Sequence, residues 1–262
     1  MSCNSYLVSI ARALVLSEQE QDSIARSITS LQSRLDSWFG NAVTDHFQFG
    51  SSVRETILPR KVDSNSDIDY MVVFDNRDNS KPQTYLERLK RFATKKYSTS
   101  EVFRDYPTTV LSLNHIKFEL VPAISYYGWD DYYQIPADTT SYMDWTLTRP
   151  MDIINRLNTK NNQHHYQIKR LVRLLKYWNV LNGKVYSSFE LESYVINHVF
   201  FGCTSLEDYF YEAVKHLPEG TLPEYKKNKV KSLKTKISAI PMLKLVGEGC
   251  AESSLQKVLP EF

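Results

Sequence analysis

The sequence is poor in cysteine, which excludes two classes of protein. Its three cysteines, Cys3, Cys203 and Cys250, lie far apart in 262 residues. None has the Cys-x-x-Cys or His-x-Cys spacing that is typical of structural zinc sites. Disulfide scaffolds are also excluded, because they need several cysteines close together in a short chain. This usage predicts a reducing compartment, and we expect a cytoplasmic protein.

A long apolar run is also lacking. No segment approaches the roughly 18 consecutive apolar residues that a membrane-spanning helix needs. The stretch from Tyr6 to Leu16 is apolar, but Arg12 interrupts it. Because no basic region precedes this stretch and no small-residue cleavage site follows it, it does not have the pattern of a secretory signal. We therefore expect no membrane association.

The chain has no excess of one charge and no internal repeat. Its 32 Lys and Arg residues nearly balance 30 Asp and Glu residues. Affinity for nucleic acid or for a triphosphate must therefore come from local charge, and the only dense basic cluster is 226–236. With 42% hydrophobic residues, the chain can bury one catalytic domain or two closely joined ones.

A glycine-serine turn and an acidic strand are the first chemically informative features. The turn is Gly50-Ser51-Ser52, which follows an expected strand over 43–49 and precedes an expected short helix over 53–58. Gly50 lets backbone approach a phosphate closely, and the hydroxyls and amides of Ser51 and Ser52 can donate to phosphate oxygens. Such turns are common, and alone this one predicts only a loop.

The acidic strand follows as Asp67-Ile68-Asp69-Tyr70-Met71-Val72-Val73-Phe74. Side chains alternate between the faces of a strand, so Asp67 and Asp69 share one face while the even-numbered residues pack on the other. An isolated Asp-x-Asp at a strand start is more often a solvated edge. Its position after the glycine-serine turn favours a functional pair.

A third acid lies in the later run His115-Ile116-Lys117-Phe118-Glu119-Leu120-Val121-Pro122. The apolar residues at 116, 118 and 120 share a face, which leaves Glu119 on the opposite one. A glutamate here is more often paired with a cation, and Lys117 is close in sequence. The alternative is a metal site: three carboxylates on neighbouring strands suit a pair of Mg²⁺ ions, with Mn²⁺ as a second option.

The second half of the sequence is predicted to be helical. A buried stripe over 165–181 predicts a helix on which Lys169, Arg173 and Lys176 share one face. Such a stripe is usually solvated, but opposite a carboxylate site it could neutralise phosphate charge. Ser187 and Glu190 have capping-box spacing at the start of the next helix, as Ser17 and Glu20 have before a helix that ends at Gly40.

The order of these segments is similar to that of the DNA polymerase β-type nucleotidyltransferases. Further motifs narrow the resemblance to the cGAS/DncV-like nucleotidyltransferases (CD-NTases), relatives of the 2′-5′ oligoadenylate synthetases. These motifs are Ile135-Pro136, Trp145-Thr146, Arg149-Pro150, the run 171–179, Ser187-Ser188-Phe189-Glu190-Leu191-Glu192 and the closing run 255–262. The segment between Ser51 and Asp67 is longer than is usual there, the third acid is Glu where Asp is commoner, and the animal enzyme's zinc-binding insertion is missing.

The resemblance implies an α/β (α+β) fold, with a polymerase β-like core built on a mixed sheet and a C-terminal helical lobe. The implied division is a core with N-terminal helices over 1–150 and, over 151–262, a helical lobe that completes the nucleotide cleft. Residues matching Asp67, Asp69 and Glu119 hold the metals in that family. Residues matching Gly50, Ser51, Lys176 and Ser188 hold the donor nucleotide, and we add Ser52 to this set.

The implied activity is attack of a ribose hydroxyl on the α-phosphate of a nucleoside triphosphate, giving a cyclic or short linear oligonucleotide messenger. The implied substrates are ATP, GTP or pyrimidine triphosphates. In bacterial antiphage signalling a separate effector protein would respond to the product, and a nucleic-acid activator stays open. The sequence also leaves open the bases, linkage and ring size of the product and the oligomeric state. It does not decide whether Glu119 or Asp69 accepts the proton.

Two other hypotheses remain at this point. An enzyme of the same superfamily could add nucleotides to an RNA 3′ end, or to a protein in the manner of a toxin; a long basic groove would favour it. A catalytically inactive binding module would be favoured by the loss of an acid, whereas all three acids are present. An aromatic-rich segment over 125–133 could stack on a nucleobase or simply cover the sheet.

Overall fold

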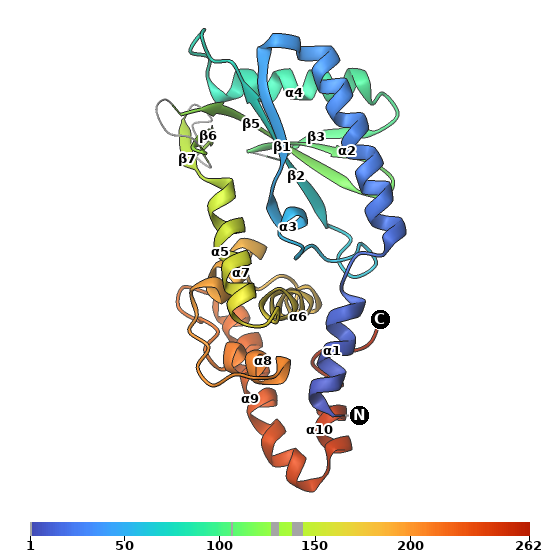
Figure 1. Ribbon diagram of the computed structural model, residues 1–262, viewed down its shortest axis with the longest axis vertical. Coiled ribbons are helices and arrows are strands. Elements are labelled where there is room, and N and C mark those ends of the chain that lie inside the picture. Colours follow the sequence, from blue (N-terminus) through green and yellow to red (C-terminus); the bar gives the residue numbers. More distant parts are fainter. Residues whose placement is uncertain (1, 106, 127–130, 138–143) are drawn as a thin grey trace. The chain divides into compact units, whose positions relative to one another are not determined.

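A computed structural model describes residues 2–105, 107–126, 131–137 and 144–262 (Figure 1). The chain forms two compact units that are discontinuous in sequence. We call residues 17–60 and 65–155 the sheet unit, and residues 1–16, 61–64 and 156–262 the helical unit. The sequence predicted a single boundary after residue 150, and the functional division attached to that boundary stays a prediction.

The described part of the sheet unit contains a seven-stranded mixed sheet with the order β1-β2-β5-β4-β3, extended by β6 on β5 and β7 on β6. The strands are β1 (Val43–Gln48), β2 (Asp67–Phe74), β3 (Glu101–Asp105), β4 (Thr108–Ser112), β5 (Lys117–Ser125), β6 (Tyr133–Pro136) and β7 (Trp145–Thr148). Neighbouring strands run antiparallel except β2 and β5, which are parallel. The parallel pair brings together the two acidic segments.

Two helices, α2 (Glu18–Phe39) and α4 (Pro82–Lys96), pack on one face of this sheet (Figure 1). The ring of Phe74 on β2 lies 5.2 Å from Phe39 of α2 and 4.7 Å from Tyr85 of α4. The even-numbered side chains of β2 therefore face these helices, as the alternation predicts. The odd-numbered side chains face the other side, where Met71 and Val73 pack in an apolar cluster.

Local sequence rules account for several of the boundaries. The predicted capping box starts α2: the Ser17 hydroxyl accepts from the Glu20 amide at 3.3 Å, and the Ser17 amide donates to the Glu20 carboxylate at 2.9 Å.

The short helix predicted over 53–58 was wrong. The single helical turn is α3 (Gly50–Val53), because the amides of Thr56 and Ile57 fold back onto the Ser51 carbonyl.

The helical unit is built from α1 (Cys3–Ala13), most of α5 (Pro150–Gln163), α6 (Ile168–Leu181), α7 (Ser188–Asn197), α8 (Leu206–Lys215), α9 (Glu224–Val246) and α10 (Glu248–Gln256). Helix α6 begins three residues later than predicted, because His165 and Tyr166 have left-handed backbone with φ of 51° and 61°. The C-terminal run is fixed by hydroxyls: Tyr6 donates to the Leu259 carbonyl at 2.6 Å, and Tyr177 donates to the Pro260 carbonyl at 2.8 Å.

Two expectations from the sequence concern an aromatic stacking surface and membrane-spanning helices. Residues 127–130 of the aromatic-rich segment lie outside the described residues, and so does the proposed stacking surface they would form. Within the described ranges, none of the helices combines the length and the apolar character that crossing a membrane requires.

Candidate active site

The two aspartates lie on the sheet face opposite α2 and α4, at the first residues of β2. Asp67 and Asp69 are half-buried, whereas Ile68 and Tyr70 between and after them are fully buried. The strand therefore changes character along its length. On this face the first two side chains are the acids Asp67 and Asp69, and the next two are the apolar Met71 and Val73.

Glu119 joins the aspartates through the parallel pairing of β5 with β2. The register places Glu119 beside Asp69 and Lys117 beside Asp67. In β5, as in β2, the half-buried residues 117 and 119 alternate with the buried Phe118 and Leu120. A side-chain hydrogen bond joins Glu119 to Asp67. We call Asp67, Asp69 and Glu119 the acid cluster.

The environment of Glu119 is dominated by burial and by other carboxylates. Burial raises the pKa of Glu119 to about 8; the charges of Asp67 and Asp69, the hydrogen bond with Asp67 and the charge of Asp105 act in the same direction. Lys117 does not pair with it, because its Nζ donates instead to Asn65 Oδ1 at 3.4 Å. Carboxylates held this close favour a proton or a cation between them, so the donor set fits Mg²⁺ or Mn²⁺.

Gly50 brings the turn against the acid cluster. It is buried, has a φ of +76°, and a Cβ at this position would lie 1.7 Å from Asp69 Oδ2. The Phe49 amide donates to the Asp69 carbonyl at 3.0 Å, which ties the entry of the turn to β2. Only glycine lets the backbone pass so close to the carboxylate. The close approach of the Gly50 backbone to a phosphate, which the sequence predicted, stays a prediction.

The two serines of the turn have different surroundings. The Ser52 hydroxyl accepts from Gln48 Nε2 at 2.7 Å and donates to the Phe49 carbonyl at 3.3 Å, so it holds the turn in place. The Ser51 hydroxyl has no hydrogen-bond partner in the described part of the chain, although the Ser51 carbonyl accepts from two amides. Of the two side chains, Ser51 is therefore the better placed to donate to a phosphate.

Lys176 and Ser188 belong to the helical unit. Lys176 is 4% exposed, and its Nζ donates to Glu192 Oε1 at 2.8 Å. Arg173 is buried as well, so the stripe is not the solvated one that its pattern suggests. Ser188 is exposed at the start of α7, where Ser187 and Glu190 form the predicted capping box. The phosphate roles of Lys176 and Ser188 stay predictions.

Sequence reasoning missed Glu192 and Gln48. Glu192 is fully buried on the apolar side of α7, next to Leu191. A glutamate at an apolar position of a helix signals a buried cation partner, and Lys176 is that partner. Gln48 carried no signal, because a glutamine at the end of a strand is ordinary.

The Lys176–Glu192 pair allows a stability effect to be separated from a nucleotide effect. Lys176→Met leaves Glu192 buried without its cation, which should cost about 3–5 kcal/mol of unfolding free energy. Replacing both residues, in Lys176→Met/Glu192→Leu, should recover most of that stability. If Lys176 also contacts the triphosphate, the double variant still has a raised KM for nucleotide. A double variant with normal KM would show that the pair is only structural.

A scan against protein-family models matched residues 1–161 to the Second Messenger Oligonucleotide or Dinucleotide Synthetase domain. The matched segment contains the acid cluster and the Gly50 turn. The chain belongs to this family. Members of this synthetase family are nucleotidyltransferases, and the present chain is accordingly a nucleotidyltransferase of the type that makes nucleotide second messengers. A search of curated proteins found no match.

Solved structures of several bacterial synthetases have the same fold as this chain. The E. coli MS115-1 CdnC structure with ATP matches with a TM-score of 0.72 at 15% identity, over 100% of this chain and 98% of that one. CdnG of Bradyrhizobium diazoefficiens with GTP matches with a TM-score of 0.72 at 11% identity, over 97% and 98%. Vibrio cholerae DncV, a cyclic AMP-GMP synthase, matches with a TM-score of 0.67 at 12% identity, over 95% and 77%. The predicted CD-NTase fold is confirmed.

The raised pKa of Glu119 predicts how stability depends on pH in the metal-free synthetase. Its folded pKa of about 8 exceeds the ordinary value of 4.5, so the folded state binds more protons between these values. Stability is therefore highest at the acidic end of this window and falls as pH rises through it. Glu119→Gln should flatten that slope. Mg²⁺ should stabilise the wild type more at about pH 8 than at about pH 5, because it competes with the proton.

Thermal melts of both proteins over this pH range, with and without Mg²⁺, measure the difference. Comparing the two proteins removes the contributions of other titrating groups that they share. Equal pH slopes in the wild type and in Glu119→Gln would contradict the assignment of a carboxylate that holds its proton inside the acid cluster.

Proposed function

We propose that the protein joins nucleoside triphosphates into a cyclic or short linear oligonucleotide, in a reaction that depends on Mg²⁺. The observation that carries the proposal is the acid cluster beside the Gly50 turn: three carboxylates share one sheet face, and Gly50 brings backbone within contact of Asp69. Bound Mg²⁺ would polarise phosphate oxygens and lower the pKa of an attacking hydroxyl.

Each residue has a distinct part in this proposal. Asp67 and Asp69 hold the metal, and Glu119 completes the donor set. Ser51 donates its hydroxyl to the donor phosphates, while Ser52 keeps the turn in position. Glu119 is the proposed acceptor of the ribose proton, because burial and its two acidic neighbours raise its pKa. Lys176 and Ser188 are proposed contacts of the donor triphosphate.

The rival hypothesis of a polymer-directed enzyme requires a basic track, and the basic cluster has other contacts. Lys226 Nζ donates to the Val185 carbonyl at 2.8 Å, and Lys229 Nζ donates to the Asn182 carbonyl at 2.7 Å. These lysines hold the connection between α6 and α7. Lys234 pairs with Glu219 at 2.6 Å. Much of the cluster therefore serves the fold, which favours small-molecule synthesis.

The decisive experiment incubates purified protein with Mg²⁺ and all four labelled triphosphates, without any polymer. Phosphatase treatment and mass spectrometry then identify resistant products and their bases. We expect an oligonucleotide product from triphosphates alone, or after addition of an activator. The exposed-lysine variant Lys231→Gln/Lys236→Gln should make the same basal product. Label found only on added transfer RNA or protein would favour the rival instead.

We further propose that the product acts on a separate effector protein in bacterial antiphage defence, as the family resemblance implies. A nucleic-acid activator is one candidate regulator. A protein regulator is a second candidate, supported by the solved complex of E. coli MS115-1 CdnC with a HORMA protein, which matches this chain with a TM-score of 0.71 at 15% identity. Repeating the synthesis assay with DNA, RNA and proteins encoded beside the synthetase gene tests both candidates.

A further inference from the structure

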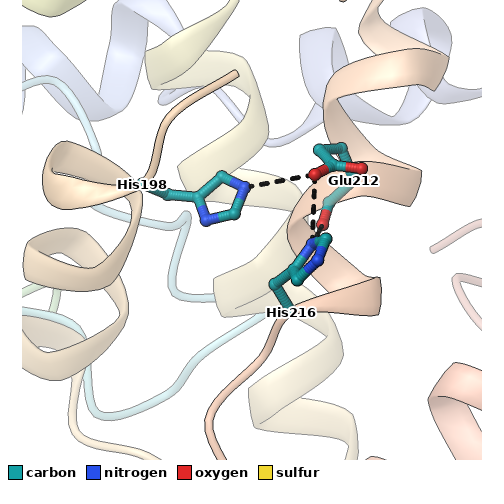
Figure 2. Close-up of side chains that lie close together, drawn as sticks. All are labelled: His198, Glu212 and His216. Atoms are coloured by element: carbon teal, nitrogen blue, oxygen red, sulfur yellow. Dashed lines mark hydrogen bonds and ion pairs between the residues drawn. The ribbon is translucent and has the colours of Figure 1, made fainter. Parts of the chain in front are cut away.

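Two histidines and a glutamate converge in the helical unit, apart from the residues that carry the proposed chemistry. Figure 2 shows His198, which follows the last residue of α7, facing Glu212 and His216 at the end of α8. Glu212 Oε1 lies 3.6 Å from His198 Nε2 and 3.1 Å from His216 Nδ1. One ligand atom from each residue lies within 4.8 Å of the other two.

Local structure explains how these residues meet. Glu212 and His216 are four residues apart, so they lie on the same side of α8. His198 is fixed at the end of α7, because Lys160 Nζ donates to the carbonyls of both Ile196 and His198. The ring of Phe200 packs 4.8 Å from the His198 ring. The His198 side chain therefore has a set position toward α8.

The contact between His198 and Glu212 suits a cation better than it suits a hydrogen bond. His198 Nε2 is buried and has no hydrogen-bond partner among the described residues, since 3.6 Å to Glu212 is too long. His216 Nδ1 faces two oxygens of Glu212, the carboxylate and the backbone carbonyl, each at 3.1 Å. A tetrahedral zinc ion with bonds of about 2.0–2.1 Å separates its ligands by roughly 3.3–3.4 Å. The two separations from Glu212 Oε1, 3.1 and 3.6 Å, lie on either side of that value.

We propose that His198 Nε2, Glu212 Oε1 and His216 Nδ1 bind one Zn²⁺ ion, which joins the end of α7 to the end of α8. Two imidazoles and one carboxylate favour zinc over Mg²⁺, which prefers oxygen ligands. The His216 side chain is 46% exposed, so water can reach the site and supply a fourth ligand. The site uses no cysteine, which is why cysteine spacing could not indicate it.

The role that follows is structural. Helix α7 carries Glu192, the partner of Lys176, and its first residue is Ser188. Zinc at the other end of α7 would hold that helix against α8. The proposal does not depend on the nucleotidyl-transfer function, because it concerns metal binding and the stability of the helical unit.

The test uses full-length protein without a histidine tag, stripped of metal by a chelator. Zn²⁺ is then titrated against a competing chelator, and bound zinc is counted by elemental analysis. We expect one tightly bound zinc per chain and a higher melting temperature with zinc. Glu212→Gln keeps the shape of the side chain but should weaken binding at least about 100-fold, since even losing a group that supports a ligand costs 10–100-fold. His216→Asn at the exposed position should act similarly.

Two control variants keep the result specific. Cys203 lines the same cavity as Glu212 and is itself a zinc ligand type, so Cys203→Ser tests whether the thiol is responsible. His165→Asn removes an exposed histidine elsewhere in the helical unit. Both controls should bind zinc as the wild type does. Co²⁺ in place of zinc should give a visible spectrum of four-coordinate cobalt without a thiolate charge-transfer band.

Several results would overturn the proposal. They are absence of zinc binding in folded wild-type protein, equal zinc affinity in Glu212→Gln and His216→Asn, or loss of binding in Cys203→Ser. Circular dichroism of the metal-free variants shows that they are folded. Asp69→Asn should bind zinc normally even if it makes no product, so failure of the zinc site and failure of the proposed function can be told apart.

Discussion

Asp69→Asn is expected to lower the rate of nucleotide joining at least about 100-fold, the typical effect of losing one preorganised electrostatic contact. Asp69 lies between Gly50 and Glu119, so its carboxylate contributes to both the metal donor set and the edge of the turn. The amide of asparagine keeps the shape but not the charge. Release of pyrophosphate from labelled triphosphates at saturating Mg²⁺ measures the effect.

A matched control lies at the other end of the same strand. Asp75 follows β2 and pairs with Arg77 near the surface, so Asp75→Asn makes the same chemical change outside the acid cluster. It should leave the rate nearly unchanged. Asp69→Asn should not destabilise the metal-free fold, because it removes a charge that repels Glu119. Near-normal turnover in Asp69→Asn would refute the acid cluster as the catalytic centre.

The features predicted well from sequence are those set by local rules. The alternation of Asp67 and Asp69 with buried neighbours needs only the two-residue period of a strand. The capping boxes at Ser17 and Ser187 need only a hydroxyl and a carboxylate three residues apart. The same period places Glu119 on a face opposite its apolar neighbours.

The features that sequence could not supply depend on pairing between distant segments. Strand alternation does not say that β2 and β5 are parallel, nor that Asp69 lies beside Glu119 in their register. The burial of Lys176 against Glu192 likewise arises from helix packing, so a stripe that would be solvated on an isolated helix becomes part of the interior. The cluster of His198, Glu212 and His216 joins the ends of two helices and has no short spacing to reveal it.

The second large effect is expected from Gly50→Ala. The new methyl group would lie 1.7 Å from Asp69 Oδ2, 2.4 Å from its Cγ and 2.7 Å from its Cβ. Because the Cβ is anchored to β2, rotating the carboxylate cannot remove the whole clash, and the turn must move away from the strand. Activity should therefore fall at least as far as in Asp69→Asn. Alanine at a φ of +76° adds roughly 1–2 kcal/mol of backbone strain.

Two comparisons separate the clash from the strain. Gly183 has a similar φ of +72°, but a Cβ there would only touch Lys229 Nζ at 3.5 Å, so Gly183→Ala should show the strain alone. The double variant Gly50→Ala/Asp69→Gly removes the three nearest atoms in the clash, and it should recover most of the additional loss of stability while staying inactive. Thermal melts measure the stability of each variant, and the pyrophosphate assay measures its activity. If Gly50→Ala were as active and as stable as Gly183→Ala, the turn could not lie against Asp69 as the structure places it, and the proposed site would lose its phosphate-binding edge.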